Sequence, residues 1–483
     1  MSAEKKPNLI FFIPDQWRGD MLGHLGNRAA QTPVLDQLVE TEAISFSQTF
    51  CQNPVCTPSR CSFMTGWYPH VRGHRSMQHL LHPGEPCLLK ELKKAGYFVY
   101  WGGKNDLVTD PLASCDYRHQ VKPTHPNLHA DTSWRDEDAY SFMAGRLKKE
   151  INESVYLDSD WAHVLDAISF AQNYDGEKPL CLFLTLEYPH PPYGVEEPYF
   201  SAIDREQLPP RIRAEDLASG KARLLEEVRK RQALSHWSEE QWNELRATYY
   251  GMAMRTDDAL GRLINTFKAT GSWDDTALFF FSDHGDYTGD YGLVEKAQNT
   301  FEDCLTHVPF VFKPPQSHPR TSGIRSALVE LIDFPATVYD LIGWQPEYTL
   351  FGKSLLPLLS RDTPHRDAVF CEGGRLPTEG HCSEGTPQAD KDSLYWPRVH
   401  VQASDAQAHG KAIMCRTERY KYVFRKEEAD EFYDLKDDPG ETKNRIDDPS
   451  LHAIATGMKE RLLDHYLETA DIVPWERDPR DSQ

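Results

Sequence analysis

Cys56 occupies a position that suits a reactive residue. It lies in the stretch N-P-V-C-T-P-S-R of residues 53–60, in which Thr57 is a good helix N-cap and Pro58 suits the first helical position. Cys56 is therefore expected at a helix N-terminus, where free N–H groups attract an anion, with Arg60 one turn further on. An isolated cysteine before a helix is most often an ordinary buried residue, so this stretch alone leaves both interpretations open.

Two pairs of polar residues, each with one aspartate, offer ligands for a divalent metal ion. Asp15 and Gln16 directly follow an apolar run at residues 8–14, and Asp283 and His284 follow another at residues 276–282. Hard cations prefer oxygen ligands, and a single imidazole nitrogen is compatible with such a set. Taken alone, an Asp-Gln pair is usually part of a loop or a cap.

The polar clusters follow strand-like runs, and this order predicts that they converge. Four short apolar runs end abruptly in polar residues; they are residues 8–14, 97–101, 180–186 and 276–282. Long helical stretches separate them, at residues 32–42, 85–95, 161–173 and 241–266. This alternation is typical of a parallel sheet covered by helices on both faces, in which ligands bind beyond the carboxyl ends of the strands.

We expect an α/β fold with a large, mostly parallel sheet between helices and a smaller C-terminal α+β subdomain. The catalytic domain is predicted at residues 1–366, with a charged helical insertion over the sheet at about residues 203–240. The smaller subdomain is predicted at residues 367–483, where the strand-like runs become shorter. No internal repeat is present.

Composition excludes several classes of protein. The 483 residues carry a net charge of −21, which disfavours nucleic acid or an anionic membrane as partners. Mean hydropathy is −0.61, and no apolar run approaches the roughly 20 residues of a membrane span. The N-terminus has no signal-peptide pattern, and ten cysteines without C-x-x-C spacing suit a reducing compartment. We therefore expect a cytoplasmic protein.

The motifs resemble those of the sulfatase family along nearly the whole chain. C-T-P-S-R at residues 56–60, followed by T-G, resembles the family's signature, in which the cysteine is oxidised to formylglycine. Three further motifs follow in the family's order. They are the opening strand with D-Q, the G-Y…G-K segment at residues 96–104, and S-D-H-G at residues 282–285 with Lys296. E-F-Y-D-L at residues 431–435 resembles its C-terminal signature.

The resemblance implies an alkaline-phosphatase-like fold and hydrolysis of a sulfate ester by a formylglycine made from Cys56. The hydrated aldehyde supplies one hydroxyl to attack sulfur, near a divalent metal that lowers its pKa, and a second to expel sulfate. A formylglycine-generating maturation enzyme is then a required partner. The substrate is expected to be a small anionic sulfate ester, and a homo-oligomer is compatible with the sequence.

The resemblance also implies a metal site, with two departures from the commonest pattern. Asp15, Gln16, Asp283 and His284 are expected ligands, together with the group made from Cys56. The family's usual pattern is Asp-Asp with Asp-Asn, and the glutamine and histidine here are closer to the choline-sulfatase and phosphonate-monoester-hydrolase branch. We expect Ca²⁺, with Mn²⁺ or Mg²⁺ as alternatives, because the imidazole makes Mn²⁺ more competitive.

Four groups are expected to act on the substrate anion: Arg60, Lys104, His190 and Lys296. His190 matches a family histidine, to which we assign leaving-group protonation or sulfate binding. The family's G-K-W-H-L is G-K-N-D-L here, so Asp106 replaces a histidine that assists breakdown of the intermediate. Three roles of Asp106 are open: it could act as a base, pair with Lys104, or contact a cationic substrate.

Other features carry weaker hypotheses. The C-x4-C-x4-C spacing at residues 51–61 fits no standard metal arrangement. Among the dense histidines of residues 70–82, His74 is the expected substrate contact. Residues 111–134 and 193–240 are expected to shape the substrate pocket. Two other functions remain open, a phosphonate monoester or phosphodiester hydrolase with the same machinery, and an anion-binding pseudoenzyme.

Overall fold

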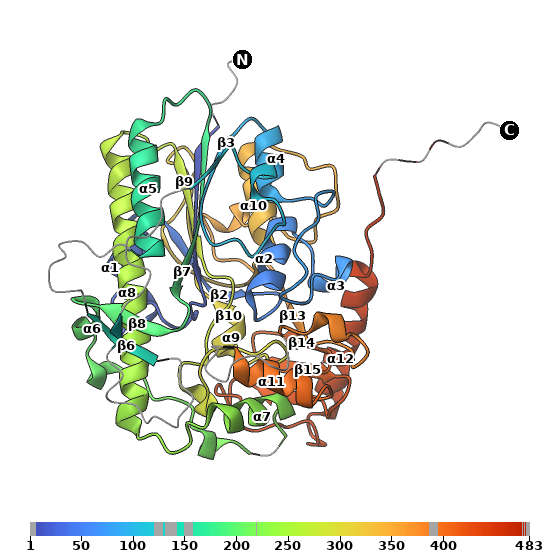
Figure 1. Ribbon diagram of the computed structural model, residues 1–483. Helices are drawn as coiled ribbons and strands as arrows, with labels where there is room; N and C mark the ends of the chain where they lie inside the picture. The colour runs from blue at the N-terminus through green and yellow to red at the C-terminus, as the bar shows by residue number, and fades with distance from the viewer. Residues whose placement is uncertain are drawn as a thin grey trace.

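The computed structural model describes residues 6–119, 129–130, 143–148, 158–218, 220–385, 395–475, 477 and 479. A nine-stranded sheet forms its centre, with the strand order β10-β2-β11-β9-β1-β7-β3-β4 and β12 paired to β2 (Figure 1). The strands of this sheet are β1 (Asn8–Asp15), β2 (Ile44–Phe50), β3 (Phe98–Gly103), β4 (Tyr117–Arg118), β7 (Leu180–Pro189), β9 (Thr276–Phe281), β10 (His307–Val308), β11 (Phe310–Lys313) and β12 (Gly323–Glu330).

The sheet is mostly parallel and buried, as the apolar runs predicted. β1 pairs in parallel with both β7 and β9, and β3 pairs in parallel with β7, whereas β11 runs antiparallel to its neighbours. All four apolar runs of the sequence form strands of this sheet. Strands buried on both faces need apolar side chains at every position, which is why these runs do not alternate with polar residues.

Helices cover both faces of the sheet (Figure 1). On one side lie α1 (Pro33–Thr41), α5 (Ser159–Asn173) and α8 (Glu239–Ala269), and on the other lie α2 (Cys56–Thr65), α4 (Leu88–Lys94) and α10 (Asp333–Ile342). Further helices are α3 (Pro69–Arg72), α6 (Tyr199–Ala202), α7 (Arg223–Gln232), α9 (Asp303–Thr306) and α11 (Trp396–Ser404). The four predicted long helices are present, although α4 begins three residues later than expected.

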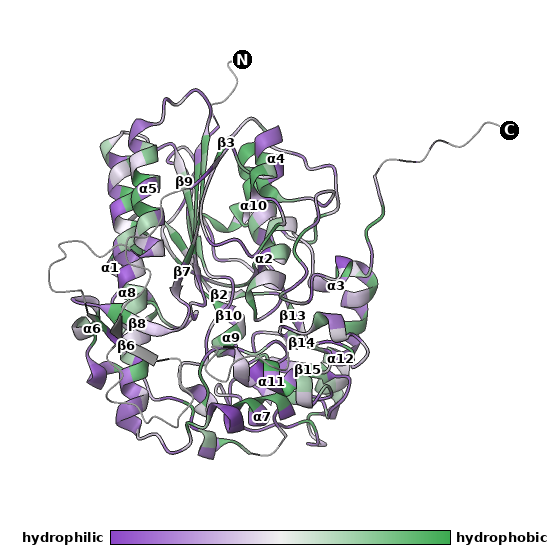
Figure 2. Cartoon of the chain, viewed as in Figure 1, coloured by the Kyte–Doolittle hydropathy of each residue, from purple (hydrophilic) through white to green (hydrophobic). Residues whose placement is uncertain are grey.

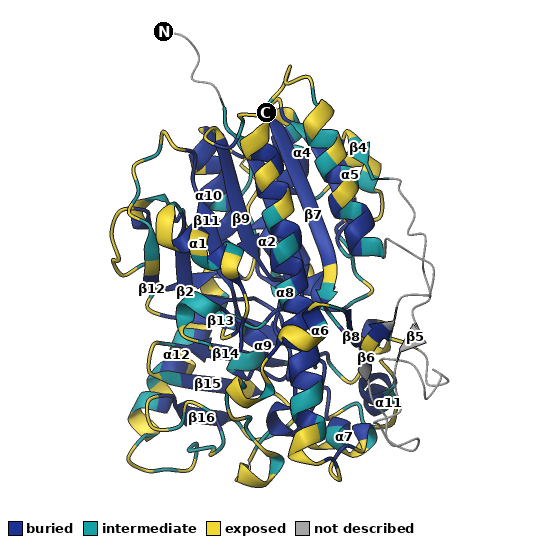
Figure 3. Cartoon of the chain, turned by 90° about the vertical axis from the view of Figure 1, so that its left-hand side faces the viewer, coloured by how far each residue is buried: buried dark blue, intermediate teal, exposed yellow. Residues whose placement is uncertain are grey.

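Successive residues of β1 enter two different cores. Ile10 and Phe12 face the core beneath α1, α5 and α8, whereas Leu9, Phe11 and Ile13 face the core beneath α2, α4 and α10. The colouring by hydropathy and by burial shows this apolar, buried centre (Figures 2 and 3). Burial on both faces makes the central strands a rigid support for whatever follows their carboxyl ends.

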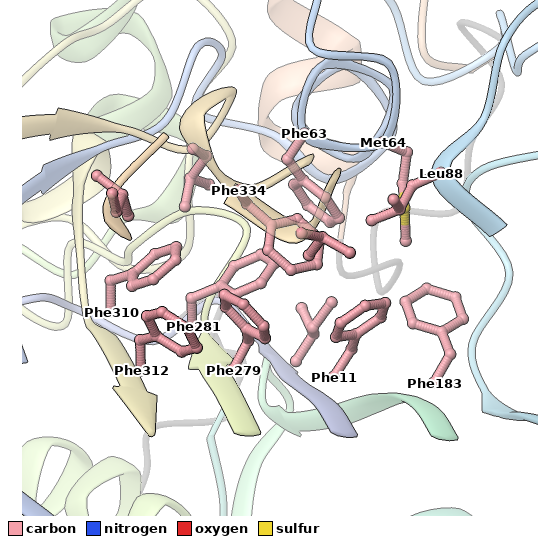
Figure 4. Close-up of a cluster of buried hydrophobic side chains, with 14 of the residues drawn as sticks. Phe11, Phe63, Met64, Leu88, Phe183, Phe279, Phe281, Phe310, Phe312 and Phe334 are labelled. Atoms are coloured by element: carbon pink, nitrogen blue, oxygen red, sulfur yellow. The ribbon is translucent and has the colours of Figure 1, made fainter. Parts of the chain in front are cut away.

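The second core fixes helix α2. Phe63 packs edge-on against Phe281, with ring centroids 5.1 Å apart, and also meets Phe334 at 6.4 Å. Figure 4 shows Phe63 and Met64 projecting from the helix into a group of phenylalanines carried by the sheet. The apolar end of α2 is thereby anchored, and its N-terminal residue Cys56 is held over the sheet edge.

A second, four-stranded antiparallel sheet lies in the C-terminal part of the chain, as expected. It consists of β13 (Val369–Gly373), β14 (Ala412–Arg416), β15 (Tyr420–Arg425) and β16 (Glu431–Asp434), and α12 (His452–Thr469) packs on it. A small third sheet contains β5 (His129–Ala130), β6 (Met143–Lys148) and β8 (Tyr193–Glu196). The division into two domains at residue 367 stays a proposal.

Residues 203–240 differ from the predicted helical insertion. In the described part of this segment, the only α-helix before α8 is α7, and the rest is loop with short 3₁₀ turns. α7 packs against α11 and not against the sheet, because its apolar face (Leu224, Leu225 and Val228) joins a separate core. None of the helices in the described ranges combines the length and apolar character that a membrane crossing requires.

Candidate active site

Four neighbouring strands carry the predicted polar residues to one edge of the sheet. Asp15 is the last residue of β1, Lys104 directly follows β3, His190 directly follows β7, and Asp283 follows β9 by two residues. These strands are adjacent in the order β9-β1-β7-β3. The convergence expected from the order of the sequence is therefore present in the structure.

Cys56 is the first residue of α2 and lies at the centre of this edge. The helix begins two residues earlier than predicted, with Val55 as its N-cap in place of Thr57. Its Sγ is 3.6 Å from both carboxylate oxygens of Asp15 and 3.2 Å from Nε2 of His284. Burial, with Asp15 as the next cause, raises the pKa of the Cys56 thiol to about 12.

A buried group of four side chains offers a metal-binding geometry. One ligand atom from each of Asp15, Cys56, Asp283 and His284 lies within 4.8 Å of all the others. Nδ1 of His284 is 3.0 Å from the carbonyl oxygen of Gly285, which leaves Nε2 facing the group. Two carboxylates and one imidazole nitrogen fit a divalent ion with oxygen preference. Among the described residues, this is the one such group of histidine, cysteine and acidic side chains.

Arg60 binds the acidic residues of this group. Its Nε donates to Asp283 at 2.8 Å and its terminal nitrogen donates to Asp15 at 3.2 Å, and the side chain is almost fully buried. Burial acts against the charge, yet the two carboxylates raise the pKa of Arg60 above its ordinary value. Arg60 is therefore a permanent cation that offsets two buried negative charges.

Lys104 is placed by a close contact between two strands. A Cβ on the preceding Gly103, whose φ is +96°, would lie 1.9 Å from the carbonyl oxygen of Thr185, so only glycine fits there. The Lys104 ammonium lies 2.7 Å from Asp15, 2.8 Å from Asp106 and 3.7 Å from the Cys56 sulfur. Of the three open roles of Asp106, pairing with Lys104 is the one for which the structure records a contact.

Lys296 reaches the site through Gln16. Its ammonium donates to the amide oxygen of Gln16 at 2.5 Å, and the amide nitrogen of Gln16 donates to Asp286 at 2.5 Å. Gln16 has a φ of +68°, a conformation that side-chain-bearing residues seldom adopt and that is often found at functional sites. Its assignment as a metal ligand stays a prediction, because its amide oxygen here accepts from lysine.

His190 lies near the same group, within the electrostatic influence of Asp15 and Lys104. Nδ1 is 2.6 Å from the carbonyl oxygen of Pro191, and Nε2 is 3.4 Å from the hydroxyl of Tyr395. Burial, with Lys296 as a further cause, lowers the pKa of His190 well below its ordinary value. The imidazolium form is therefore a stronger acid than the imidazolium of an unperturbed histidine.

His74 is engaged elsewhere. Its Nδ1 is 3.0 Å from the carbonyl oxygen of His79, and its Nε2 is 3.0 Å from a carboxylate oxygen of Glu85. Both ring nitrogens are thus occupied within the loop that carries the residue, so the expected substrate contact remains a prediction. Of the predicted pocket segments, residues 120–128, 131–134 and 219 lie outside the described residues.

Residues that were not among the predicted candidates complete the site. Asp286 accepts from Gln16 and from the hydroxyl of Tyr193, and Tyr395 comes from the C-terminal part of the chain. Asp286 directly follows the S-D-H-G motif, and an acidic residue at that position is a sequence signal for a side chain close to the site. Tyr395 lies in no motif, and a single sequence carries no signal that brings it to His190.

Comparison with known proteins identifies the family of the chain. A family model described as Sulfatase matches residues 7–344. The chain is 26% identical to a multifunctional alkaline phosphatase superfamily protein, PehA, from Trinickia caryophylli, over 96% of each chain. It is 25% identical to a choline-sulfatase from Rhizobium meliloti, over 92% of this chain and 83% of that protein. The phosphonate monoester hydrolase of Agrobacterium radiobacter has the same fold, with a TM-score of 0.78 at 23% identity and coverage of 98% and 100%.

Proposed function

The chain belongs to the sulfatase family and is a hydrolase of that family, and from this premise we propose that it cleaves a small organic sulfate ester with a formylglycine made from Cys56. The observation that carries the proposal is the position of Cys56. Its Sγ lies at the first residue of a buried helix, 3.2 Å from His284 and 3.7 Å from the Lys104 ammonium. The candidate metal ligands and a cation thus surround Sγ of Cys56, the atom that the nucleophile would replace.

The divalent metal that the family implies fits the residues present. Asp15, Asp283 and His284, with the group made from Cys56 and with Gln16 after release from Lys296, would hold it. We propose Ca²⁺, with Mn²⁺ or Mg²⁺ as alternatives, because carboxylate oxygens dominate and one nitrogen is present. When bound, the metal supplies Lewis-acid activation of the nucleophile.

Three cations neutralise the oxygens of the bound ester. Arg60, Lys104 and Lys296 surround Cys56 from three different segments and are held by hydrogen bonds to Asp15, Asp283 and Gln16. A sulfate ester reacts slowly because its negative oxygens repel a nucleophile, so fixed positive charge at this point favours the transition state. These cations also offset, locally, the net charge of −21.

His190 is suited to protonate the leaving group. The hydrogen bond from Nδ1 to Pro191 fixes the ring so that Nε2 faces away from the main chain and toward Tyr395. Burial lowers the pKa of His190, so the free ring is neutral near pH 7 and this role requires that Nε2 takes up a proton when the ester anion binds. We propose that Nε2–H donates to the departing oxygen, with sulfate binding as the alternative role.

Two site residues favour a second candidate, a phosphonate monoester or phosphodiester hydrolase. Gln16 and His284 are the departures that resemble that branch, whereas Lys104 favours sulfate because that branch tends to lack this lysine. The deciding experiment compares kcat/KM for an aryl sulfate, an aryl phosphonate monoester and a phosphodiester with the same phenol. We expect the sulfate to be the best substrate, and a higher value for the phosphonate contradicts the proposal.

The same proposal includes several properties of the whole protein. A formylglycine-generating enzyme acts on Cys56, the catalytic domain covers residues 1–366, and the protein works in the cytoplasm. An anion-binding pseudoenzyme is the third candidate, and it requires that Cys56 stays a thiol. A purified chain that binds sulfate but turns over none of the three esters would favour the pseudoenzyme.

A further inference from the structure

Helix α11 inserts an arginine beside the site. Arg398 projects from the first turn of α11, is nearly fully buried, and forms an ion pair with Glu295. A second ion pair, at 2.5 Å, joins Arg398 to Glu384. Tyr395, which caps the same helix and approaches His190, lies over the guanidinium at 4.5 Å. Through Arg398 and Tyr395, the N-terminal end of α11 therefore reaches the segments that carry Lys296 and His190.

Glu295 lies next in sequence and in space to Lys296. One of its carboxylate oxygens is 3.2 Å from the Lys296 ammonium, and the other accepts from Arg398. Both Glu295 and Lys296 are 2% exposed. The backbone of Glu295 has a φ of +69°, and its N–H donates to the hydroxyl oxygen of Tyr193, which holds the residue in place. This carboxylate therefore touches two buried cations at once.

The charge of Glu295 has consequences for substrate binding. In a buried environment, an ammonium group and a carboxylate without other partners attract each other strongly. A Glu295 that paired with Lys296 alone would compete with the substrate anion for this cation. Arg398 offers a planar fork of donors, which suits it to hold carboxylates on two sides.

We infer that Arg398 is a positioning residue that holds the Glu295 carboxylate and thereby keeps the Lys296 ammonium available for the substrate anion. The inference rests on the proposed function, in which Lys296 binds the ester, and assigns to the C-terminal part of the chain a role in that binding. Arg398 itself has no recorded contact with Cys56 or with the metal-type ligands, so it acts through Glu295.

Four variants test this inference: Arg398→Gln, Arg398→Lys, Glu295→Gln and the double variant Arg398→Gln/Glu295→Gln. KM and kcat are measured with an aryl sulfate, and the binding of inorganic sulfate is measured by calorimetry. We expect Arg398→Gln to raise KM and the Kd for sulfate by about tenfold, within the range of couplings between contacting residues. Arg398→Lys is expected to lose less, since it keeps a cation against Glu295.

The double variant separates positioning from structural support. Removal of the Glu295 charge is expected to restore sulfate binding to within about threefold of wild type, because no carboxylate then competes for Lys296. Arg366→Gln, which removes a buried guanidinium paired with Glu330 and Asp333, is the matched control and is expected to leave KM unchanged. Thermal unfolding of every variant accompanies the kinetics.

Three results would overturn the inference. They are normal sulfate binding in Arg398→Gln, an equal loss in the single and double variants, and a tenfold loss in Glu295→Gln alone. The last variant keeps the inference testable if Arg398→Gln fails to fold. A wild-type chain that hydrolyses no sulfate ester contradicts the proposed function instead, while the calorimetry with inorganic sulfate still tests the role of Arg398.

Discussion

The Lys104 ammonium lies 2.8 Å from the Asp106 carboxylate. The same ammonium lies 2.7 Å from Asp15 and 3.7 Å from Cys56, so Asp106 contacts a cation that lies beside the nucleophile. Where the family pattern has a histidine, this chain thus has an acid in contact with a lysine of the site. The contact supports an orienting role for Asp106.

We predict that Asp106→Asn raises KM roughly three- to tenfold and slows the first chemical step, without a burst of leaving group. The reason is that Lys104, having lost one carboxylate, is drawn toward Asp15. Pre-steady-state traces on one neutral aryl sulfate and on choline sulfate provide the measurement.

Two other outcomes of that experiment would assign Asp106 differently. A burst followed by turnover that is roughly 10²–10⁴-fold slower indicates a base in the second half of the reaction. A loss confined to the cationic substrate indicates a substrate contact. Unchanged kinetics on both substrates would show that the contact with Lys104 has no role.

Cys56→Ala should abolish turnover and leave the fold intact. The side chain is small and stands at the first position of α2, whose anchoring residues lie at its other end. We expect the free energy of unfolding to change by about 1 kcal/mol. Cys56→Ser should be equally inactive wherever only cysteine-type maturation is available. Substantial activity in either variant, measured by steady-state turnover of an aryl sulfate, is incompatible with the mechanism.

Asp15→Asn and Asp283→Asn should weaken divalent-ion binding by about 100-fold or more and lower kcat more than they raise KM. Each removes one charge from the buried group and leaves Arg60 with one ionic partner fewer. Metal content by mass spectrometry and turnover after titration with Ca²⁺ or Mn²⁺ give the two readouts. Full activity in a thoroughly chelated enzyme would refute the requirement for metal.

Much of this site could be predicted from the sequence, because the pattern of neighbouring residues determines where each strand ends and which polar residue follows it. A run of apolar residues that ends in a polar cluster predicts a buried parallel strand and a functional carboxyl end, and this holds for Asp15, Lys104, His190 and Asp283. Thr57 and Pro58 are good cap and first-turn residues and predict a start of α2 at residue 58, whereas the helix begins at Cys56. The backbone N–H of Ser59 donates to the carbonyl oxygen of Val55, and this hydrogen bond of the first turn, not the cap preference of Thr57, sets the start of the helix.

Long-range contacts account for what the sequence did not predict. Arg398 and Tyr395 meet Glu295 and His190 across about 100 and 200 residues of chain, and no spacing rule relates them. His74 shows the opposite case, in which a residue chosen for its type is occupied by neighbours within its own loop. Side-chain chemistry suggests candidates, but only packing decides which of them meet.

A further prediction concerns stability and not catalysis. Asp257 on α8 is buried and accepts the backbone N–H groups of Val34 and Leu35 at the start of α1. Burial raises its pKa to about 7, so between its ordinary value and pH 7 the folded state binds more protons than the unfolded state. Stability contributed by this group therefore falls as pH rises across that range.

Asp257→Asn should remove this dependence, because the amide keeps an acceptor oxygen and does not titrate. Denaturant unfolding of the wild type and the variant at several pH values between 4 and 7 measures the difference in free energy of unfolding. We expect the variant to gain stability relative to the wild type as pH rises. A constant difference across this range would show that Asp257 does not titrate as described.

The mass of the peptide that contains Cys56 tests the central claim most directly. Oxidation of the thiol to the aldehyde lowers the mass by about 18 Da, which intact-protein and peptide mass spectrometry resolve. The chain should be expressed together with a formylglycine-generating enzyme, and its turnover of an aryl sulfate should be measured on the same sample. We predict that the apparent kcat rises in proportion to the fraction of chains in which Cys56 is modified. Full turnover by a chain in which Cys56 remains an unmodified thiol would contradict the account.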